Sequence, residues 1–165
     1  MRCVIHACYL TQTMLFKTPV GTLTLGYIGK NIICEFGERK VDSEPSKKLA
    51  QQMKSYLEGN SIQCFDVETP VGPPFTSRCW EACKKIKYGE TTTYHLLAKK
   101  AGSPKAARAA GQAMRANPTV ILTPCHRVIA TSGKLHGFAG STHPDSPELK
   151  QKQFLLSLEA STIDV

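Results

Sequence analysis

Residues 93 to 118 read TYHLLAKKAGSPKAARAAGQAMRANP, and this stretch decides how the second half of the chain folds. A short helix is predicted from about Thr93 to Lys100, and Gly102 closes it. Ser103-Pro104 predicts a restart, with a serine N-cap and proline at the first helical position. This second helix runs through Met114 and stops before Asn117-Pro118, because the residue before proline disfavours helical geometry. Two short helices joined by a three-residue turn indicate a helix-turn-helix, although helical hairpins are common.

The second predicted helix carries almost no bulk. Its small residues are Ala106, Ala107, Ala109, Ala110, Gly111 and Ala113, and its projecting cations are Lys105, Arg108 and Arg115. One interpretation is a helix that needs small residues to pack against its neighbours. The other is a helix that lies very close to a nucleic-acid backbone, with Arg108 reaching into the duplex.

Upstream, the pattern predicts one more helix and a linker. Thr76 could cap a helix whose inner face consists of Cys79, Trp80, Cys83 and Ile86. The turn at residues 88–90 follows this helix. The proline-rich stretch at residues 70–74 is the natural linker, so we expect domains at 1–70 and 71–165.

The first part of the chain has strand and helix patterns. Strands are predicted around Leu23-Thr24-Leu25 and around residues 32–36, with a hairpin turn at residues 29–31. Residues 46–58 suit a helix with Leu49, Met53, Tyr56 and Leu57 on one stripe and Gly59 as its stop. The expected fold class is α+β, with a small antiparallel sheet first and a mostly helical domain after it.

Composition narrows the class of protein. The chain has 165 residues, 41% of them hydrophobic, which suits a globular protein with a real core. Its apolar runs are far too short for a membrane span, and the N-terminus does not resemble a secretory signal. Seven cysteines without regular spacing indicate free thiols and an intracellular, reducing compartment.

The positive charge lies mainly in the second half. Residues 1–74 hold 8 Lys and Arg against 7 Asp and Glu, and residues 75–165 hold 13 against 6. A basic half is expected where a protein meets a polyanion, although a basic surface without any partner is also compatible with this charge.

Cys125 is the candidate nucleophile. A β-rich run, Thr119 to Thr123, precedes it, and the chain continues as Pro124-Cys125-His126-Arg127-Val128. The basic neighbours and a following helix start would lower the pKa of the thiol and favour the thiolate. The alternative is a buried structural cysteine beside a chance histidine. Cys79 and Cys83 are expected to be core residues.

Several spaced motifs resemble the O6-alkylguanine-DNA alkyltransferase family. The hexapeptide from Pro124 to Ile129 is similar to its active-site signature. Residues 75–80, 88–90, 93–94, 104–109 and 113–118 are also similar to family motifs. The resemblance covers residues 75–159, with a length change between Gly140 and Lys150, and is looser over residues 15–60.

The family implies a fold and a function. The N-terminal domain would be ribonuclease-H-like and the C-terminal domain winged-helix-like. The protein would remove the alkyl group from O6-alkylguanine, and from O4-alkylthymine, once and irreversibly. It would bind double-stranded DNA as a monomer through the minor groove and flip the damaged nucleotide out of the stack. We expect it in the nucleus if eukaryotic and in the cytoplasm if prokaryotic.

The resemblance also assigns residues. Cys125 would accept the alkyl group, with His126 as its base through a water and Glu159 orienting His126, a Cys-His-Glu relay. Asn117 would brace the loop bearing Cys125. The implied DNA contacts are Tyr94 and Arg108, which drive the flip, with Thr76, Ser103, Ala107 and Thr131. The implied pocket consists of Met114, Val128 (whose backbone reads the guanine amino group), Phe138, Ala139 and Gly140.

Two departures from the family pattern stand out. The loop at residues 137–141 reads GFAGS where the family has Gly-Tyr-X-Gly-Gly, so Phe138 lacks a hydroxyl and Ser141 replaces a glycine. Some members bind a structural zinc. Cys3, His6, Cys8 and Cys34 are available here, but their spacing fits no standard site, so we expect no cofactor.

Two other functions remain as alternatives. A binding-only lesion sensor would share the DNA-binding elements, but such relatives replace the active-site cysteine, commonly with tryptophan. A cysteine hydrolase acting on a small molecule could use Cys125 and His126, but it would leave the basic half of the chain unexplained.

Overall fold

The computed structural model describes residues 7–10 (backbone only), 13–133, 135, 137–139, 141, 143 and 145–160. The first half forms a meander of four antiparallel strands in chain order. These strands are β1 (Ala7–Leu10), β2 (Thr13–Thr18), β3 (Gly21–Ile28) and β4 (Asn31–Phe36). The predicted hairpin is confirmed: Ile28 pairs with Asn31 across a turn in which Gly29 adopts φ +58°.

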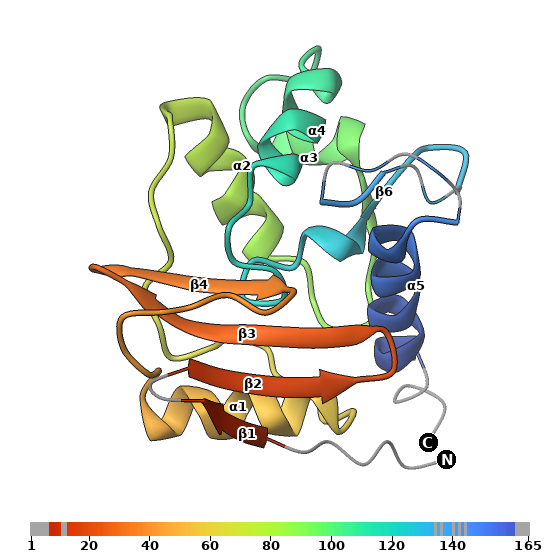
Figure 1. Cartoon of the computed structure of the whole chain (residues 1–165). Helices are drawn as coiled ribbons and strands as arrows, with labels where there is room; N and C mark the ends of the chain where they lie inside the picture. Colours follow the sequence, from red (N-terminus) through yellow and green to blue (C-terminus); the bar gives the residue numbers. More distant parts are fainter. Residues whose placement is uncertain are drawn as a thin grey trace.

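Helix α1 (Lys47–Leu57) follows the sheet and confirms the predicted stripe. Ser46 caps it, because its hydroxyl accepts a hydrogen bond from the Leu49 amide. The buried side chains are the four expected ones: Leu49, Met53, Tyr56 and Leu57. In Figure 1 this helix runs beside β1 and β2.

The second half consists mainly of helices. They are α2 (Pro74–Lys84), β5 (Thr92–Thr93), α3 (Tyr94–Lys100), α4 (Ala107–Arg115), a 3-10 helix η1 (Cys125–Arg127), β6 (Val128–Ile129) and α5 (Pro147–Ala160). The two-residue strands β5 and β6 pair in parallel. The coarse expectation of an antiparallel sheet followed by helices is confirmed, and one hydrophobic core runs through both halves.

Two predicted helix starts are wrong. Thr76 does not cap α2, which begins two residues earlier at Pro74. Helix α4 begins at Ala107 rather than Ser103. Ser103 instead belongs to a turn, because its amide donates to Ala98 O at the end of α3 and its carbonyl accepts from the Ala106 amide.

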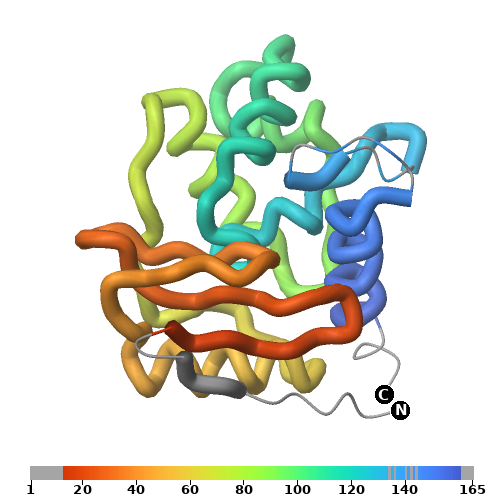
Figure 2. The backbone as a smooth tube through the Cα atoms, viewed as in Figure 1, coloured from red at the N-terminus to blue at the C-terminus, as the bar shows by residue number. Residues whose placement is uncertain are grey.

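The region before Cys125 is a turn rather than the predicted strand. Thr119 and Val120 make isolated bridges with Cys34 and Thr123, and Ile121 has a positive φ of 74°. Composition favoured a strand there because Thr, Val and Ile prefer extended conformations. In the structure the segment instead forms backbone hydrogen bonds with Cys34 of β4, a residue far away in the sequence. These bonds hold it as a loop, which Figure 2 shows passing beside β4.

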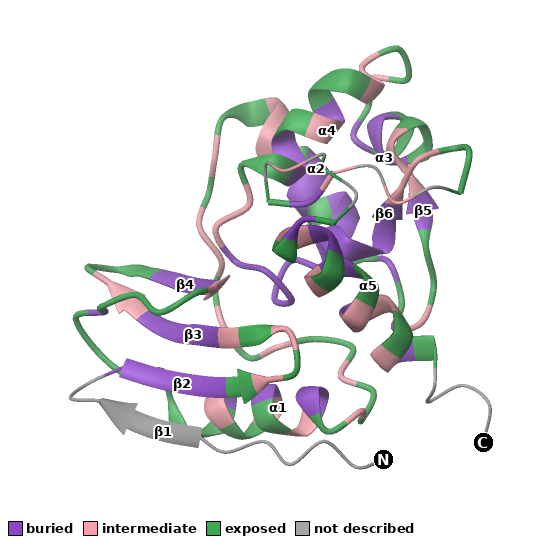
Figure 3. Ribbon diagram, turned by 45° about the vertical axis from the view of Figure 1, so that its right-hand side comes forward, coloured by how far each residue is buried: buried purple, intermediate pink, exposed green. Residues whose placement is uncertain are grey.

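The alanine-rich helix α4 packs small residues against its neighbours, as the first interpretation expects, and leaves its other side exposed. Ala110 and Ala113 are buried, and Trp80 Nε1 of α2 donates to Ala113 O at 2.8 Å. Ala109 and Arg108 are exposed on the other side. Figure 3 shows this division, with buried residues of α4 facing α2 and exposed residues facing outward.

No helix in the described part of the chain is long and apolar enough to cross a membrane.

Candidate active site

Asn117 holds together the loop that carries Cys125. Its Oδ1 accepts hydrogen bonds from the amide and the hydroxyl of Thr119, both at 3.0 Å. Its Nδ2 donates to Thr123 O at 2.9 Å and to Cys125 Sγ at 3.2 Å. One side chain therefore closes the loop and also contacts the thiol.

Strand β4 anchors the same loop from outside. The Cys34 amide donates to Pro118 O at 3.1 Å, and the Val120 amide donates to Cys34 O at 2.7 Å. These backbone bonds fix the loop to the N-terminal sheet, and the position of Cys125 therefore depends on both halves of the chain.

The Cys125 thiol is almost fully buried. Its exposed fraction is 5%, and it forms no disulfide. Burial raises the pKa of Cys125, although the Asn117 hydrogen bond and the positive charge of Lys152 act in the opposite direction. The expectation that basic neighbours lower this pKa is wrong for the free protein. The Arg127 guanidinium does not serve the thiol, because it binds Glu159 and Ile86 O instead.

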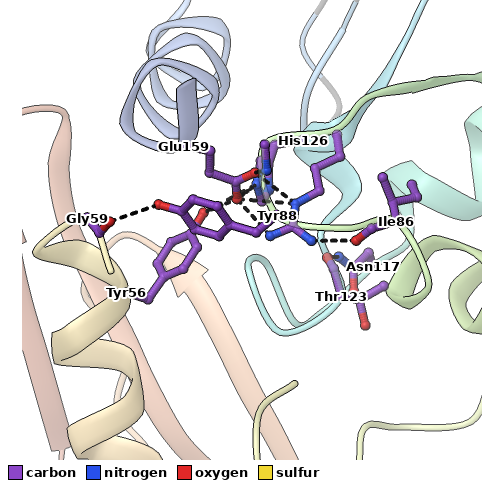
Figure 4. Close-up of polar contacts among 10 residues, drawn as sticks. Tyr56, Gly59, Ile86, Tyr88, Asn117, Thr123, His126 and Glu159 are labelled. Carbon is purple, nitrogen blue, oxygen red and sulfur yellow. Dashed lines mark hydrogen bonds and ion pairs between the residues drawn. The ribbon is translucent and has the colours of Figure 1, made fainter. Parts of the chain in front are cut away.

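Glu159 of α5 lies beside His126 at the centre of a buried network. His126 Nε2 is 2.8 Å from Glu159 Oε1. Arg127 donates to the same carboxylate through Nε and Nη2, each at 2.9 Å, and the Gly89 amide donates to Oε2 at 3.0 Å. The Tyr56 hydroxyl donates to Oε1 at 2.7 Å. Figure 4 shows these groups converging from α1, α5 and the loops of the second half.

The two titrating groups of this network have opposite tendencies. Burial alone raises the pKa of Glu159, but hydrogen bonds from His126 and Arg127 outweigh it and hold that pKa well below its usual range. Burial lowers the pKa of His126, and the Glu159 carboxylate opposes this only in part. Glu159 is therefore ionised and His126 neutral near pH 7.

A neutral histidine carries one ring proton, and Glu159 determines which nitrogen holds it. Because a carboxylate only accepts hydrogen bonds, the proton must lie on Nε2. Nδ1 is then an acceptor. It is buried and has no hydrogen-bond partner among the described residues.

Cys125 forms part of the wall of a cavity of about 340 Å³ beside the helix-turn-helix. The predicted residues Tyr94, Arg108, Ala107, Met114, Phe138 and Ala139 line it with the cysteine. Gly140 lies outside the described residues. Val128 does not line this cavity: it is fully buried, and its carbonyl accepts a hydrogen bond from Lys152 Nζ at 2.7 Å.

The other predicted DNA contacts lie apart from the cavity. Thr76 is half-buried within α2, and Ser103 is half-buried in the turn between α3 and α4. Thr131 is exposed, two residues after β6. None of these three residues lines the cavity.

Lys152 and Tyr56 were missed by sequence reasoning. The Lys152 side chain is fully buried, its Nζ lies 5.8 Å from the centre of the Tyr94 ring, and burial lowers its pKa to about 8. A signal existed for it, since Lys152 shares one face of α5 with Leu149, Leu155 and Glu159 at helical spacing. A charged residue on such a stripe indicates a buried role.

Most of the candidate zinc ligands lie outside the described residues, namely Cys3, His6 and the side chain of Cys8. Cys34 is fully buried, and burial raises the pKa of its thiol far above the usual range. Among the residues with described side chains, no group of three His, Cys, Asp or Glu could hold a metal.

Known proteins resemble the chain over most of its length. The family model described as "6-O-methylguanine DNA methyltransferase, DNA binding domain" matches residues 74–161. The methylated-DNA--protein-cysteine methyltransferase of Methanosarcina acetivorans is 39% identical over 160 residues, covering 89% of this chain and 97% of the relative. That of Mycolicibacterium paratuberculosis is 38% identical over 156 residues, covering 86% and 88%.

Solved structures of proteins from the same family also match the chain. The crystal structure of Mycobacterium tuberculosis OGT in complex with DNA matches with a TM-score of 0.74 and 35% sequence identity, covering 90% of this chain and 92% of that one. The structure of Mycobacterium tuberculosis O6-methylguanine methyltransferase matches with a TM-score of 0.73 and 34% identity over the same shares. Together with the geometry around Cys125, these likenesses show that the chain belongs to the 6-O-methylguanine DNA methyltransferase family.

Proposed function

We propose that this chain repairs DNA by direct reversal, moving the alkyl group of O6-alkylguanine, and of O4-alkylthymine, onto Cys125. The observation that carries the proposal is a free thiol in the wall of a cavity beside a helix-turn-helix, contacted by Asn117 and followed in sequence by a histidine paired with a buried carboxylate. Relatives named methylated-DNA--protein-cysteine methyltransferase support it.

The chemistry is a direct displacement at carbon. A carbon–sulfur bond forms as the bond from carbon to guanine O6 breaks, and the electron pair leaves with the guanine. The thiol proton passes through a water to His126 Nδ1, an acceptor without a hydrogen-bond partner among the described residues. Glu159 then stabilises the imidazolium. A thioether has no easy route back to the thiol, so one protein repairs one base.

The raised pKa of Cys125 fits such coupled proton transfer. A buried thiol stays protonated and unreactive until substrate arrives, and a neutral His126 can take its proton at that moment. Tyr94 borders the cavity and would donate its hydroxyl proton toward the departing guanine. Burial raises the pKa of Tyr94 to about 12, which keeps this hydroxyl protonated.

Lys152 is a buried cation that acts on Cys125, Val128 and Tyr94. Its positive charge favours the Cys125 thiolate, and its Nζ holds the Val128 carbonyl and faces the Tyr94 ring. We assign Lys152 a positioning role for the buried residues next to the cavity. If Val128 reads the guanine amino group through its backbone, Lys152 fixes the orientation of that carbonyl.

DNA would meet the face formed by α3 and α4. Double-stranded DNA is expected to bind through its minor groove, with Arg108 filling the space of the flipped nucleotide and Tyr94 crowding its phosphate. Arg108 is exposed at the start of α4, and both side chains line the cavity with Cys125. Thr76, Ser103, Ala107 and Thr131 would contact the backbone on either side.

The proposal extends to the two domains of the chain, its oligomeric state and its place in the cell. We assign residues 1–70 to a ribonuclease-H-like domain and 71–165 to a winged-helix-like domain. The protein would act as a monomer without a cofactor, inside the cell where the DNA is. The family membership supports these assignments.

Loss of O6-methylguanine from an oligonucleotide tests the function. Equimolar protein should remove the lesion from duplex DNA in one turnover, as measured by nucleoside analysis. Cys125→Ala should abolish removal while keeping DNA binding, and Cys79→Ala, which changes another buried thiol, should retain removal. Removal by Cys125→Ala, or many turnovers per protein, would contradict the proposal.

A further inference from the structure

Tyr56, from the N-terminal half of the chain, contacts both His126 and Glu159 of the Cys-His-Glu relay. Tyr56 is the tenth residue of α1, 70 residues before His126 and 103 before Glu159. Its side chain is fully buried, and its ring meets Phe65 and Tyr88 edge-on. In Figure 4 its hydroxyl points from α1 toward the Glu159 carboxylate and His126.

The hydrogen-bond geometry fixes how the Tyr56 hydroxyl is used. It has one proton, which goes to Glu159 Oε1 at 2.7 Å. Its oxygen also lies 3.3 Å from His126 Nε2. A hydroxyl that already donates can only accept from that nitrogen, so the contact is compatible with Nε2–H and not with a bare Nε2.

We propose that Tyr56 is a positioning residue of alkyl transfer: by donating to Glu159 Oε1 and facing His126 Nε2, it holds the imidazole with Nδ1 free to take the thiol proton. This inference rests on the proposed function of Cys125 and His126. It gives the N-terminal half a part in positioning the groups that carry out the chemistry.

Tyr56 also limits how strongly Glu159 attracts the proton on His126. Oε1 accepts from Tyr56, from His126 and from Arg127, and each donor reduces the charge available to the others. Within the described part of the chain, the other charged groups that act on His126 are Arg127 and Lys152, both of which favour the neutral ring. Without the Tyr56 hydroxyl, Glu159 pulls harder on the imidazolium and the pKa of His126 rises.

The test is the pH profile of methyl transfer in Tyr56→Phe. Only neutral His126 can accept the proton, so the rate falls on the acid side of the His126 pKa. The variant should shift this fall upward by about half to one pH unit, which makes it about 3- to 10-fold slower than the wild type at acid pH. At alkaline pH the two rates should approach one another. A purely structural role predicts a loss that is the same at every pH.

Tyr88→Phe is the matched control. The Tyr88 hydroxyl donates to Gly59 O at 3.3 Å and ties the loop after α2 to the residues after α1. Its removal takes away a hydroxyl from the same cluster and leaves the bonds of Tyr56, His126 and Arg127 to Glu159 in place. The acid side of its pH profile should coincide with that of the wild type. Thermal unfolding of both variants measures how far stability changes.

A measurement without DNA separates this inference from the proposed function. Nitrogen NMR of the wild-type protein should show the proton of neutral His126 on Nε2, and its titration in Tyr56→Phe should show the higher pKa. A wild-type proton on Nδ1, or identical titrations and pH profiles, would overturn the role of Tyr56. Failure of the wild type to transfer methyl at any pH would instead overturn the proposed function.

Discussion

Replacing Glu159 by glutamine should destabilise the protein severely, because the carboxylate has donors on both oxygens. Oε1 accepts from Tyr56, His126 and Arg127 Nη2, and Oε2 accepts from Arg127 Nε and the Gly89 amide. A glutamine must place its NH₂ group at one of these two positions. Whichever way it turns, donor faces donor and the buried Arg127 charge loses its counter-ion.

The magnitude follows from burial. The exposed fractions of Glu159 and Arg127 are 1% and 3%, so neither group can turn to water. Removal of one partner from a buried ion pair costs about 3–5 kcal/mol of unfolding free energy. In a chain of this length, each kcal/mol lowers Tm by about 2–4 °C, so the loss should be on the order of 10 °C.

The pH dependence has a definite sign. Donors hold the pKa of Glu159 below its value in the unfolded chain. The carboxylate therefore contributes stability above the unfolded value of about 4.3, and that contribution is lost as pH falls toward the folded value. The difference in stability between wild type and Glu159→Gln should be full at neutral pH and shrink below about pH 4.

Urea denaturation at pH 7 and at about pH 3.5 measures both effects. Glu38→Gln is the control, since Glu38 forms an exposed ion pair with Lys17 and its loss should not be measurable at pH 7. A loss below about 1 kcal/mol at pH 7 would refute the reasoning, because it is less than a buried partner should cost. So would a loss that persists undiminished in acid.

Two predictions concern DNA. Arg108→Ala should slow repair of duplex DNA about 10-fold or more and slow the reaction with free O6-benzylguanine far less, because only the duplex needs base flipping. Single-turnover rates measure both reactions, and equal losses would mean that Arg108 has a structural role instead. Lys99 and Lys100 are exposed at the end of α3. The log–log slope of affinity against salt should be on the order of −3 to −4, and changing both lysines to glutamine should flatten it by about 1–2 while weakening all sequences alike. Fluorescence anisotropy from about 50 to 300 mM salt measures this, and a flat wild-type response would favour a small-molecule hydrolase.

Local sequence predicted elements well where the signal was local. The stripe of α1 and the β3–β4 hairpin both depend on residues a few positions apart. The helix start predicted at Ser103-Pro104 was wrong, because the same residues suit both a helix start and a turn. The Ser103 amide is occupied by Ala98 O, which only the closing of α3 determines.

Cys125, His126, Glu159 and Asn117 were predicted from the sequence and lie close together, but their electrostatic environment was not predicted. Arg127 follows the Cys125–His126 pair in sequence, yet its guanidinium serves Glu159 in space. Tyr56 reaches the network from the other half of the chain, and Lys152 enters it through burial. The Tyr56 contact arises from tertiary packing and leaves no spacing rule in the sequence, whereas Lys152 has the helical spacing of the buried face of α5.

The mass of the protein after reaction tests the central claim most directly. The intact chain is incubated with an excess of duplex DNA containing O6-methylguanine, and the modified peptide is then mapped. We expect a gain of about 14 Da, at most once per molecule and located on Cys125. Unchanged mass, a second addition, or a methyl group on Cys34, Cys64, Cys79 or Cys83 would contradict the account.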